Sequence, residues 1–242
     1  MNIFVDLLVS LTKLFSGNLG VTIIFIGIVS RAVFYPMLKS SHQQIKLQRD
    51  LKPKLDQIKK KYKNDRRRQM EEQTKLFQQA GFNPAAGCLA SIVQLVVALI
   101  LLNALNGLLK SGLSTHFLGW DLAHPDRFQL QGVNFDLPGI LVVLTAVATL
   151  LQSKMMLPEP LPIDASDTKK EVGEKEDLTD ALTSAQGQFV YLLPIIILFS
   201  GRIFPAGLAL YWLVGTVVGL VQQYYISGFG GLTPWVKFLQ RK

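Results

Sequence analysis

The sequence predicts an all-α integral membrane protein with five transmembrane helices, a helical hairpin in the cytoplasm and an N-terminal helix at the membrane interface. Hydrophobic residues make up 49% of the 242 positions and charged residues 17%, whereas an ordinary soluble domain carries roughly 25% charged residues. Five apolar segments approach the roughly 20 residues that a helix needs to cross a hydrocarbon core of about 30 Å. Lys and Arg gather on one side of these segments.

Residues 1–17 form the first predicted element, an amphipathic helix lying in the membrane interface. Its apolar residues recur at helical spacing, with Asp6 and Lys13 between them, which is typical of an interfacial helix. An uncleaved signal sequence is the alternative interpretation, although no basic region precedes the apolar stretch. The apolar residues are Ile3, Phe4, Leu7, Leu8, Leu11, Leu14 and Phe15.

The membrane-spanning segments are predicted to be helices because lipid offers no hydrogen-bond partner to a backbone N–H or C=O group. The apolar range 189–226 is interrupted between Gly201 and Pro205, which predicts that it forms two helices, the fourth and the fifth, joined in a tight hairpin. The predicted segments are residues 18–38, 86–105, 138–157 and the hairpin 189–226.

The distribution of basic residues predicts the orientation in the membrane. Twenty Lys or Arg residues fall on the side of residues 39–85 and of the short basic tail 227–242, and four on the side of the loop 106–137. Because basic residues remain in the cytoplasm, the N-terminus is predicted to lie outside and the C-terminus inside. The remaining basic residue, Arg31, lies within the first span.

The cytoplasmic segment 39–85 is predicted to be a helical hairpin. An apolar stripe marks its first arm and the second arm follows over residues 66–80. Pro53 is expected to start a new helix rather than to break one. With 13 basic and 5 acidic residues, the hairpin is a candidate for binding anionic lipids, ribosomal RNA or another cytoplasmic partner, or for fixing topology alone. The stripe consists of Leu47, Leu51, Leu55, Ile58 and Tyr62.

The second cytoplasmic loop, residues 158–188, has the opposite charge. It is acidic and contains several Pro and Ser residues. We expect it to be flexible and assign it no chemistry.

Arg31 is the most informative single residue of the sequence. It lies about 18 Å from the outer end of the first helix and about 12 Å from the inner end at 1.5 Å per residue. A guanidinium at this depth costs roughly 2.5–3.5 kcal/mol on insertion scales, and no Asp or Glu occurs in any predicted span. A water-filled cavity is the preferred interpretation, and snorkelling of the side chain to the inner interface is the alternative.

Two glutamines lie at a similar depth. Gln94 and Gln152 fall about 12 and about 9 Å from the inner face, so a hydrophilic hollow open to the cytoplasm follows if these faces converge. A hydrogen bond between helices is the alternative for each glutamine. Trp212 lies about 21 Å above the inner face, where an indole also serves as an interfacial anchor.

Three stretches of the sequence resemble the YidC-type membrane protein insertases, which include the Oxa-type proteins of mitochondria. The similarity covers about residues 15–226, with the same order of spans and the same basic hairpin. Ala90, Val96 and Thr216 depart from residues common in the family. The matching stretches are Asn18-Leu19-Gly20 with Arg31 and Pro36, Asn83-Pro84-Ala85-Ala86-Gly87-Cys88-Leu89 with Gln94, and Phe204-Pro205-Ala206-Gly207-Leu208-Ala209-Leu210-Tyr211-Trp212 with Gln222-Gln223.

The resemblance implies a membrane protein insertase of the bacterial plasma membrane. Arg31 corresponds to the groove arginine that attracts acidic extracellular tails, and Gln94, Gln152 and Trp212 correspond to other groove-lining positions. The implied partners are nascent membrane proteins, anionic lipids, the ribosome and the Sec translocation channel, and one copy is expected to suffice. No catalytic residue, cofactor or metal is implied, and the sequence has no Gly-rich phosphate loop.

Three other classes of protein remain as alternatives. A small anion transporter or channel would use Arg31 as its binding charge, although five spans do not divide into repeats. An intramembrane enzyme would need a catalytic constellation that the spans lack. A passive assembly chaperone would bind membrane proteins without moving their tails.

Overall fold

The computed structural model describes residues 3–63, 65–108, 114–129, 136–157 and 178–240. Most of these residues are helical, which confirms the helical class of the prediction. The helices are α1 (Ile3–Leu14), α2 (Leu19–Val33), α3 (Tyr35–Lys61), α4 (Arg66–Ala80), α5 (Pro84–Leu108), α6 (Ile140–Met156), α7 (Leu178–Ser200), α8 (Ala206–Ser227) and α9 (Thr233–Gln240).

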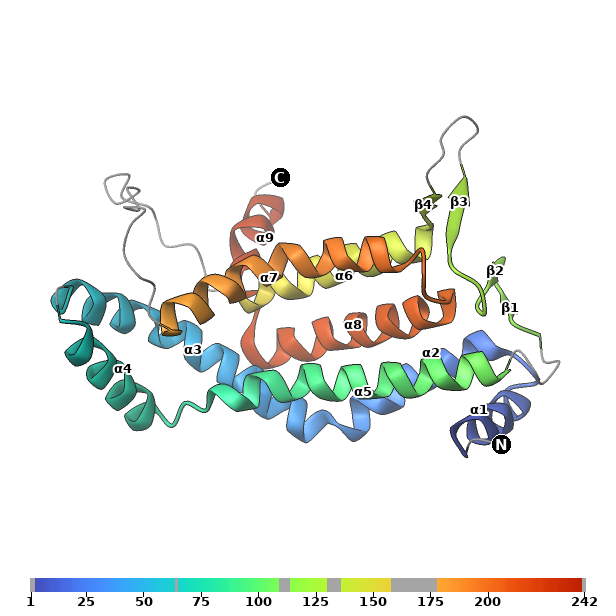
Figure 1. Ribbon diagram of the computed structural model, residues 1–242, viewed down its shortest axis with the longest axis horizontal. Coiled ribbons are helices and arrows are strands. Elements are labelled where there is room, and N and C mark those ends of the chain that lie inside the picture. The colour runs from blue at the N-terminus through green and yellow to red at the C-terminus, as the bar shows by residue number, and fades with distance from the viewer. Residues whose placement is uncertain (1–2, 64, 109–113, 130–135, 158–177, 241–242) are drawn as a thin grey trace.

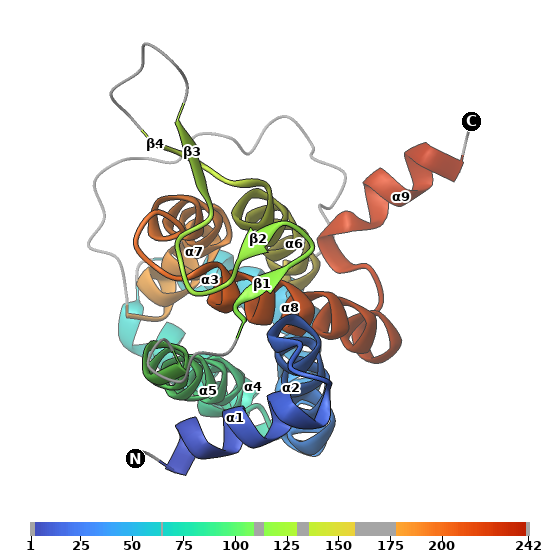
Figure 2. The same cartoon turned by 90° about the vertical axis from the view of Figure 1, so that its right-hand side faces the viewer.

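Helices α2, α5, α6, α7 and α8 run side by side along the long axis of the molecule (Figure 1). Helix α8 occupies the middle, where it packs against α2, α5 and α6. The hairpin of α3 and α4 extends beyond one end of this bundle, hereafter the hairpin end, and the short strands lie at the other, the strand end. Seen along the bundle, α1 crosses beneath the helices and α9 projects from one side (Figure 2).

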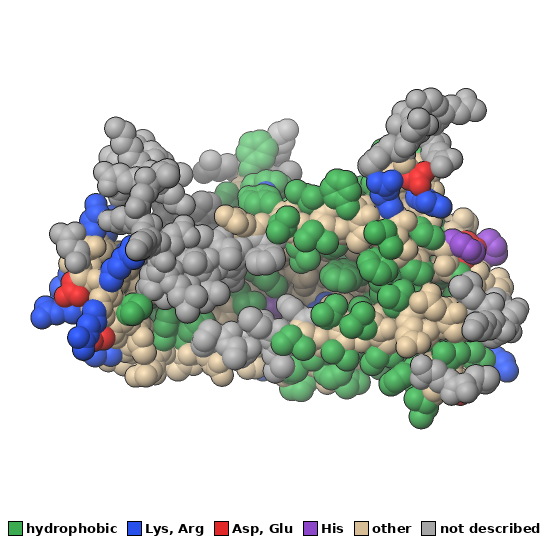
Figure 3. Space-filling view, in the orientation of Figure 1, with side chains coloured by type: hydrophobic (Ala, Val, Ile, Leu, Met, Phe, Trp, Pro, Cys, Tyr) green, Lys and Arg blue, Asp and Glu red, His purple; other side chains and the backbone are tan. Residues whose placement is uncertain are grey.

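The outer surface of the bundle is apolar. Figure 3 shows hydrophobic side chains over its middle, whereas Lys and Arg gather mainly on the α3–α4 hairpin. A surface of this kind suits lipid rather than water. The exposed apolar residues include Phe25, Ile28 and Val29 of α2, Ile92, Leu95 and Leu99 of α5, Val143, Leu144 and Val147 of α6, and Ile195, Ile196 and Phe199 of α7.

By length and apolar composition, α8 is the one described helix able to cross a membrane by itself. Helices α1 and α2 pass the same test together, but a bend of 112° separates them. Shorter apolar stretches occur at Ile92–Gly107, Ile140–Met156 and Val190–Ser200. The predicted number of five spans therefore stays a prediction.

The range predicted as a first spanning helix, residues 18–38, contains two helices. Helix α2 ends at Val33, and Phe34, with φ −87° and ψ 7°, separates it from α3. Pro36 explains the new start, because a proline in the first turn needs no intrahelical N–H partner. Helix α3 then continues without interruption into the first arm of the hairpin.

The prediction that Pro53 starts a new helix is wrong. Pro53 lies inside α3, which continues to Lys61. An interior proline removes one intrahelical hydrogen bond. The helix nevertheless packs against the rest of the chain next to it, where Leu51 is only 6% exposed.

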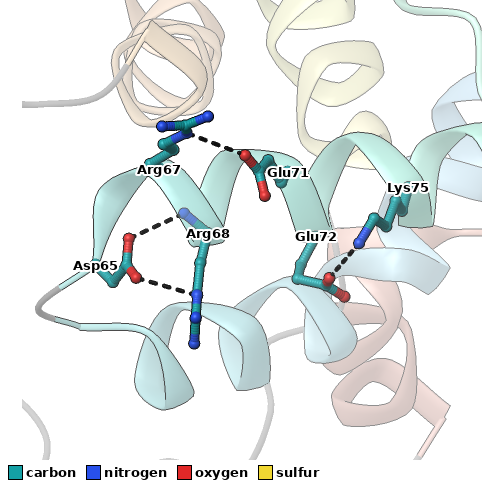
Figure 4. Close-up of polar contacts among 6 residues, drawn as sticks. All are labelled: Asp65, Arg67, Arg68, Glu71, Glu72 and Lys75. Atoms are coloured by element: carbon teal, nitrogen blue, oxygen red, sulfur yellow. Dashed lines mark hydrogen bonds and ion pairs between the residues drawn. The ribbon is translucent and has the colours of Figure 1, made fainter.

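Helix α4 has the bounds predicted for the second arm. The Asp65 carboxylate accepts a hydrogen bond of 3.1 Å from the N–H of Arg68 and caps its start, and Gly81, with φ 65°, ends it. Ion pairs on its exposed face, between Arg67 and Glu71 and between Lys75 and Glu72, are drawn in Figure 4. Gln69 and Gln73 form its buried face.

The strand end contains four short strands that the prediction of an all-α fold missed. They are β1 (His116–Phe117), β2 (Trp120–Asp121), β3 (Arg127–Gln129) and β4 (Asp136–Pro138), paired as antiparallel β1-β2 and β3-β4. Strands of two or three residues are too short to produce a detectable alternation of polar and apolar residues.

The loop around these strands caps two helices of the bundle. The carbonyls of His124 and Leu122 accept hydrogen bonds of 2.8 and 2.9 Å from the N–H groups of Ala206 and Gly207, at the start of α8. The Asp126 carboxylate accepts hydrogen bonds from the first N–H groups of α6, at 2.8 Å from Leu141. The loop therefore closes the strand end.

The structure describes the acidic loop 158–188 and the basic tail 227–242 only in part. Residues 158–177 of the acidic loop lie outside the described residues, whereas residues from 178 belong to α7. The basic tail contains α9, preceded by the short 3-10 helix Gly230–Leu232. Arg49 of α3 holds this region, since it donates hydrogen bonds of 3.1 Å to the carbonyl of Met155 and 2.8 Å to that of Ser227.

Candidate functional site

The inward face of α8 carries two glycines and a glutamine four residues apart: Gly215, Gly219 and Gln223. Residues at this spacing lie on one side of a helix. A β-carbon placed on Gly215 would lie 3.4 Å from Nε of Arg31, and one on Gly219 would lie 3.1 Å from Nη1 of the same side chain. The guanidinium therefore lies inside the bundle, along the bare backbone of α8.

Both predicted glutamines reach the same place. The amide nitrogen of Gln94 would lie 3.6 Å from a β-carbon on Gly215, and that of Gln152 would overlap a β-carbon on Gly219. Three helices, α2, α5 and α6, thus direct polar side chains at one face of a fourth. Arg31, Gln94 and Gln152 are hereafter the polar cluster.

Trp212 does not belong to this cluster. It packs against an apolar group between α6 and α7, which contains Val142, Ala146 and Ile197. The neighbouring residue Tyr211, almost completely buried at 1% exposure, faces the Arg31 side instead.

A small pocket opens next to the guanidinium, between α2, the start of α3, α5 and α8. Its lining is apolar apart from a few polar groups, which is the usual character of a binding site. In Figure 3 a recess between the apolar surfaces contains basic and histidine atoms. The residues that line this Arg31 pocket are Ser30, Arg31, Phe34, Leu38, Val93, Gln94, Val97 and Tyr211.

Several polar atoms of this region lack hydrogen-bond partners among the described residues. They include Nε of Arg31, Nε2 of Gln94 and both amide atoms of Gln223, which is 0% exposed. Leaving such groups unpaired costs about 1–3 kcal/mol each. The arrangement therefore suits water or a polar ligand.

The charge of the polar cluster is not neutralised by its own helices. Helices α2, α5, α6 and α8 contain no Asp or Glu. A cation flanked by amide donors, without a countercharge, matches the chemistry of a carboxylate. The described residues of the cluster offer no nucleophile with an adjacent base.

Four further residues of this region, His42, Tyr211, Gln222 and Gln223, were not selected as site residues from the sequence. His42 of α3 is 4% exposed, and neither ring nitrogen has a hydrogen-bond partner in the described part of the chain. Gln222 donates a long hydrogen bond of 3.4 Å to the carbonyl of Arg31. For Gln223, the four-residue spacing from Gly215 and Gly219 was a detectable signal of a close helix contact. Tyr211 belongs to a stretch that resembles the insertase family, whereas for His42 no sequence signal existed.

Comparison with known proteins gives a family for the chain. A family model described as the 60Kd inner membrane protein matches residues 10–230. Proteins named membrane protein insertase YidC are similar over 88% of this chain: that of Geobacter sulfurreducens is 30% identical over 215 residues, that of Syntrophobacter fumaroxidans 31% over 217, and that of Rickettsia massiliae 30% over 224.

The matched region is a minor part of these relatives. It covers 34%, 35% and 36% of the three proteins, respectively. The chain therefore spans about a third of the length of the curated relatives that it matches.

Proposed function

The chain belongs to the 60Kd inner membrane protein family, and on this premise we propose that it inserts newly made membrane proteins into the lipid bilayer. The polar cluster would receive the polar tail of the incoming protein from the cytoplasm. The apolar segment of that protein would then leave sideways into lipid. No covalent catalysis and no cofactor take part.

The proposal includes an orientation in the membrane. The hairpin end faces the cytoplasm, because the basic residues concentrate there. The N-terminus lies outside, α1 rests in the outer interface, and the helices α2 with the start of α3, α5, α6, α7 and α8 provide five spans of a bacterial plasma membrane. The apolar surface of the bundle supports this arrangement.

The observation that carries the proposal is the convergence of Arg31, Gln94 and Gln152 on the glycine face of α8. A carboxylate in the substrate's tail would be attracted to Arg31 more strongly than in water, because the surrounding wall has a low dielectric constant. The tail then has a shorter apolar distance left to cross. A membrane potential adds about 2.3 kcal/mol per charge per 100 mV to the outward movement of a carboxylate.

Burial of the substrate's own apolar helix in lipid provides the downhill step. Each CH₂ group transferred from water contributes about 0.8 kcal/mol. The energy source is therefore the substrate itself, which agrees with the absence of a phosphate-binding loop from the sequence.

The strand end argues against the alternative of an anion channel. A channel needs a continuous polar path, but Leu122, Leu105 and Ile23, each at most 2% exposed, close the bundle beyond Tyr211. A pocket that apolar residues close on the side of the strand end is the geometry of a receiving site. Anion flux in proteoliposomes tests this alternative directly.

We also propose partners from the charge of the surfaces. The basic α3–α4 hairpin suits anionic lipid headgroups, at about 1 kcal/mol per basic residue near the leaflet. The ribosome and the Sec channel are further candidates for contact with this hairpin. A single copy contains the whole polar cluster, so a monomer suffices.

The test is insertion of a single-span substrate into proteoliposomes that contain the chain, read out by protease protection. Two substrates differ in the N-terminal tail, one with acidic residues and one with the matching amides. For the acidic tail we expect Arg31→Glu to reduce insertion at least about tenfold, the factor that about 1.4 kcal/mol provides. Arg31→Lys retains the charge and is expected to retain most of the activity.

Equal insertion by Arg31→Glu and the wild type would contradict the role of the charge. Photo-crosslinking from position 31 to a stalled nascent chain adds a test of position. A crosslink to the acidic tail supports the proposed site, and crosslinks to lipid alone would contradict it.

A further inference from the structure

His42 is a buried titratable group that the proposed mechanism leaves unused. Its side chain is 4% exposed, and both ring nitrogens lack hydrogen-bond partners among the described residues. An imidazole always presents at least one donor, and its second nitrogen is an acceptor when the ring is neutral. A buried ring with neither group satisfied is suited to a ligand or to water.

The position of His42 relates it to the Arg31 pocket. Leu38, which lines this pocket, precedes His42 by four residues in the same helix. Residues at this spacing share a face of a helix, about 6 Å apart along its axis. His42 therefore lies one turn beyond the pocket wall, towards the hairpin end.

We propose that His42 is a second binding group for acidic substrate tails, which accepts a proton when a substrate carboxylate enters and returns it when the carboxylate leaves. This inference rests on the function proposed above. The proton comes from water on the cytoplasmic side and goes back there, so the step needs no other reactant. His42 would thus hold a carboxylate before or after Arg31 does.

The electrostatic surroundings of His42 agree with a ring that is neutral in the empty site. Burial lowers the pKa of His42 to about 4, and the positive charge of Arg31 acts in the same direction. An incoming carboxylate counteracts these effects without removing the burial, since an opposite charge within about 4–6 Å typically raises the proton affinity of a histidine tenfold or more. A neutral ring at this position also avoids a second buried cation near Arg31.

Apart from Arg31, the helices packed against α3 place no charged side chain of the described residues against His42. Helices α5 and α8 contain no Asp, Glu, Lys or Arg, and α8 offers tyrosines as its titratable groups. Helix α2 contributes Arg31, and the buried face of α4 consists of Gln69 and Gln73. Among the described residues that face His42, Arg31 is therefore the dominant charge.

The direct test is a pH titration of the imidazole signals by NMR in lipid nanodiscs. The chain has three histidines, and variants of His116 and His124, which lie at the strand end, assign the signals. We expect a saturating peptide with an acidic tail to raise the proton affinity of His42 at least about tenfold. The peptide with the matching amides should leave the signal unchanged. An unchanged His42 titration with the acidic peptide bound would overturn the inference.

A functional test uses His42→Gln, which retains hydrogen bonding but cannot titrate. For the acidic-tailed substrate we expect wild-type insertion to increase by about twofold between pH 7 and pH 5, because a tenfold rise in the proton affinity of a ring whose pKa is about 4 takes effect in this acidic range. The variant's insertion should stay constant. With the neutral tail the two profiles should coincide. Superimposed profiles with the acidic tail would also overturn the inference, whereas equal activity of Arg31→Glu and the wild type would instead contradict the proposed function.

Discussion

The two halves of the helical bundle are built from the same helices but differ in their interiors. Towards the strand end, the core consists of apolar residues such as Leu105, Leu122 and Ile23, and the loop caps α6 and α8 through hydrogen bonds. Towards the hairpin end, Arg31, Gln94 and Gln223 have buried polar atoms without partners among the described residues. One half is thus packed for stability, whereas the other retains unsatisfied polar groups.

The difference shows where stability and function separate in this fold. Apolar side chains that interdigitate stabilise a bundle whatever its outer solvent. Buried polar groups without partners destabilise it, and functional sites are where such costs persist. We therefore call the strand end the anchor of the bundle, because its apolar packing stabilises the helices that also carry the unsatisfied polar groups.

The largest expected effect is on the anchor. Leu122→Ala removes a side chain with 0% exposure and should lower the free energy of unfolding by about 2–5 kcal/mol. Thermal unfolding in nanodiscs measures this loss, while insertion per folded molecule should stay close to that of the wild type. Leu118→Ala is the matched control, because Leu118 lies in the same loop and is 78% exposed. An unchanged melting temperature for Leu122→Ala would refute the assignment of the strand end as anchor.

A smaller effect is expected in the polar half, on activity rather than stability. Gly219→Ala places a β-carbon against the Gln152 amide and the Arg31 guanidinium, so insertion of acidic-tailed substrates should fall about tenfold, corresponding to about 1.4 kcal/mol. Gly215→Ala is the control one turn away, since its β-carbon would meet atoms at ordinary contact distances of 3.4 and 3.6 Å. If both variants insert equally well, the close approach at Gly219 does not position the guanidinium.

The smallest effect is the pH dependence of the strand end. Burial raises the pKa of Asp121, but hydrogen bonds from Thr115, the Ala123 N–H and His124 outweigh burial and lower it to about 2. Because the folded value lies below that of the unfolded chain, this stabilisation is complete above about pH 4 and is lost as the pH falls towards 2. Partial exposure of the carboxyl limits the contribution to about 1 kcal/mol. Asp121→Asn should remove this part of the acid dependence of unfolding, and an identical acid profile would argue against it.

Much of the fold follows from local sequence. The bounds of α4 were predicted from its breakers, and the apolar ranges of α5, α6 and α8 from their length. The resemblance to the insertase family is confirmed by the family match. The continuous course of α3 through Pro53 runs against the local preference of proline, so the sequence pattern did not predict it. The short strands give too little alternation to be detected, and the break at Phe34, although Pro36 marks it locally, was hidden within a continuous apolar range.

For the candidate site too, some features follow from the sequence and others depend on the tertiary structure. By itself, the sequence predicted a cation and two amides at similar heights along their helices and determined that the predicted spans carry no acidic residue, since helical rise converts residue number into height. The tertiary structure decided which way each side chain faces: it brought Arg31, Gln94 and Gln152 to the glycines of α8, turned Trp212 towards α6 and α7, and buried His42. Rotation of one helix against another is fixed by contacts between distant segments, and no local pattern encodes it.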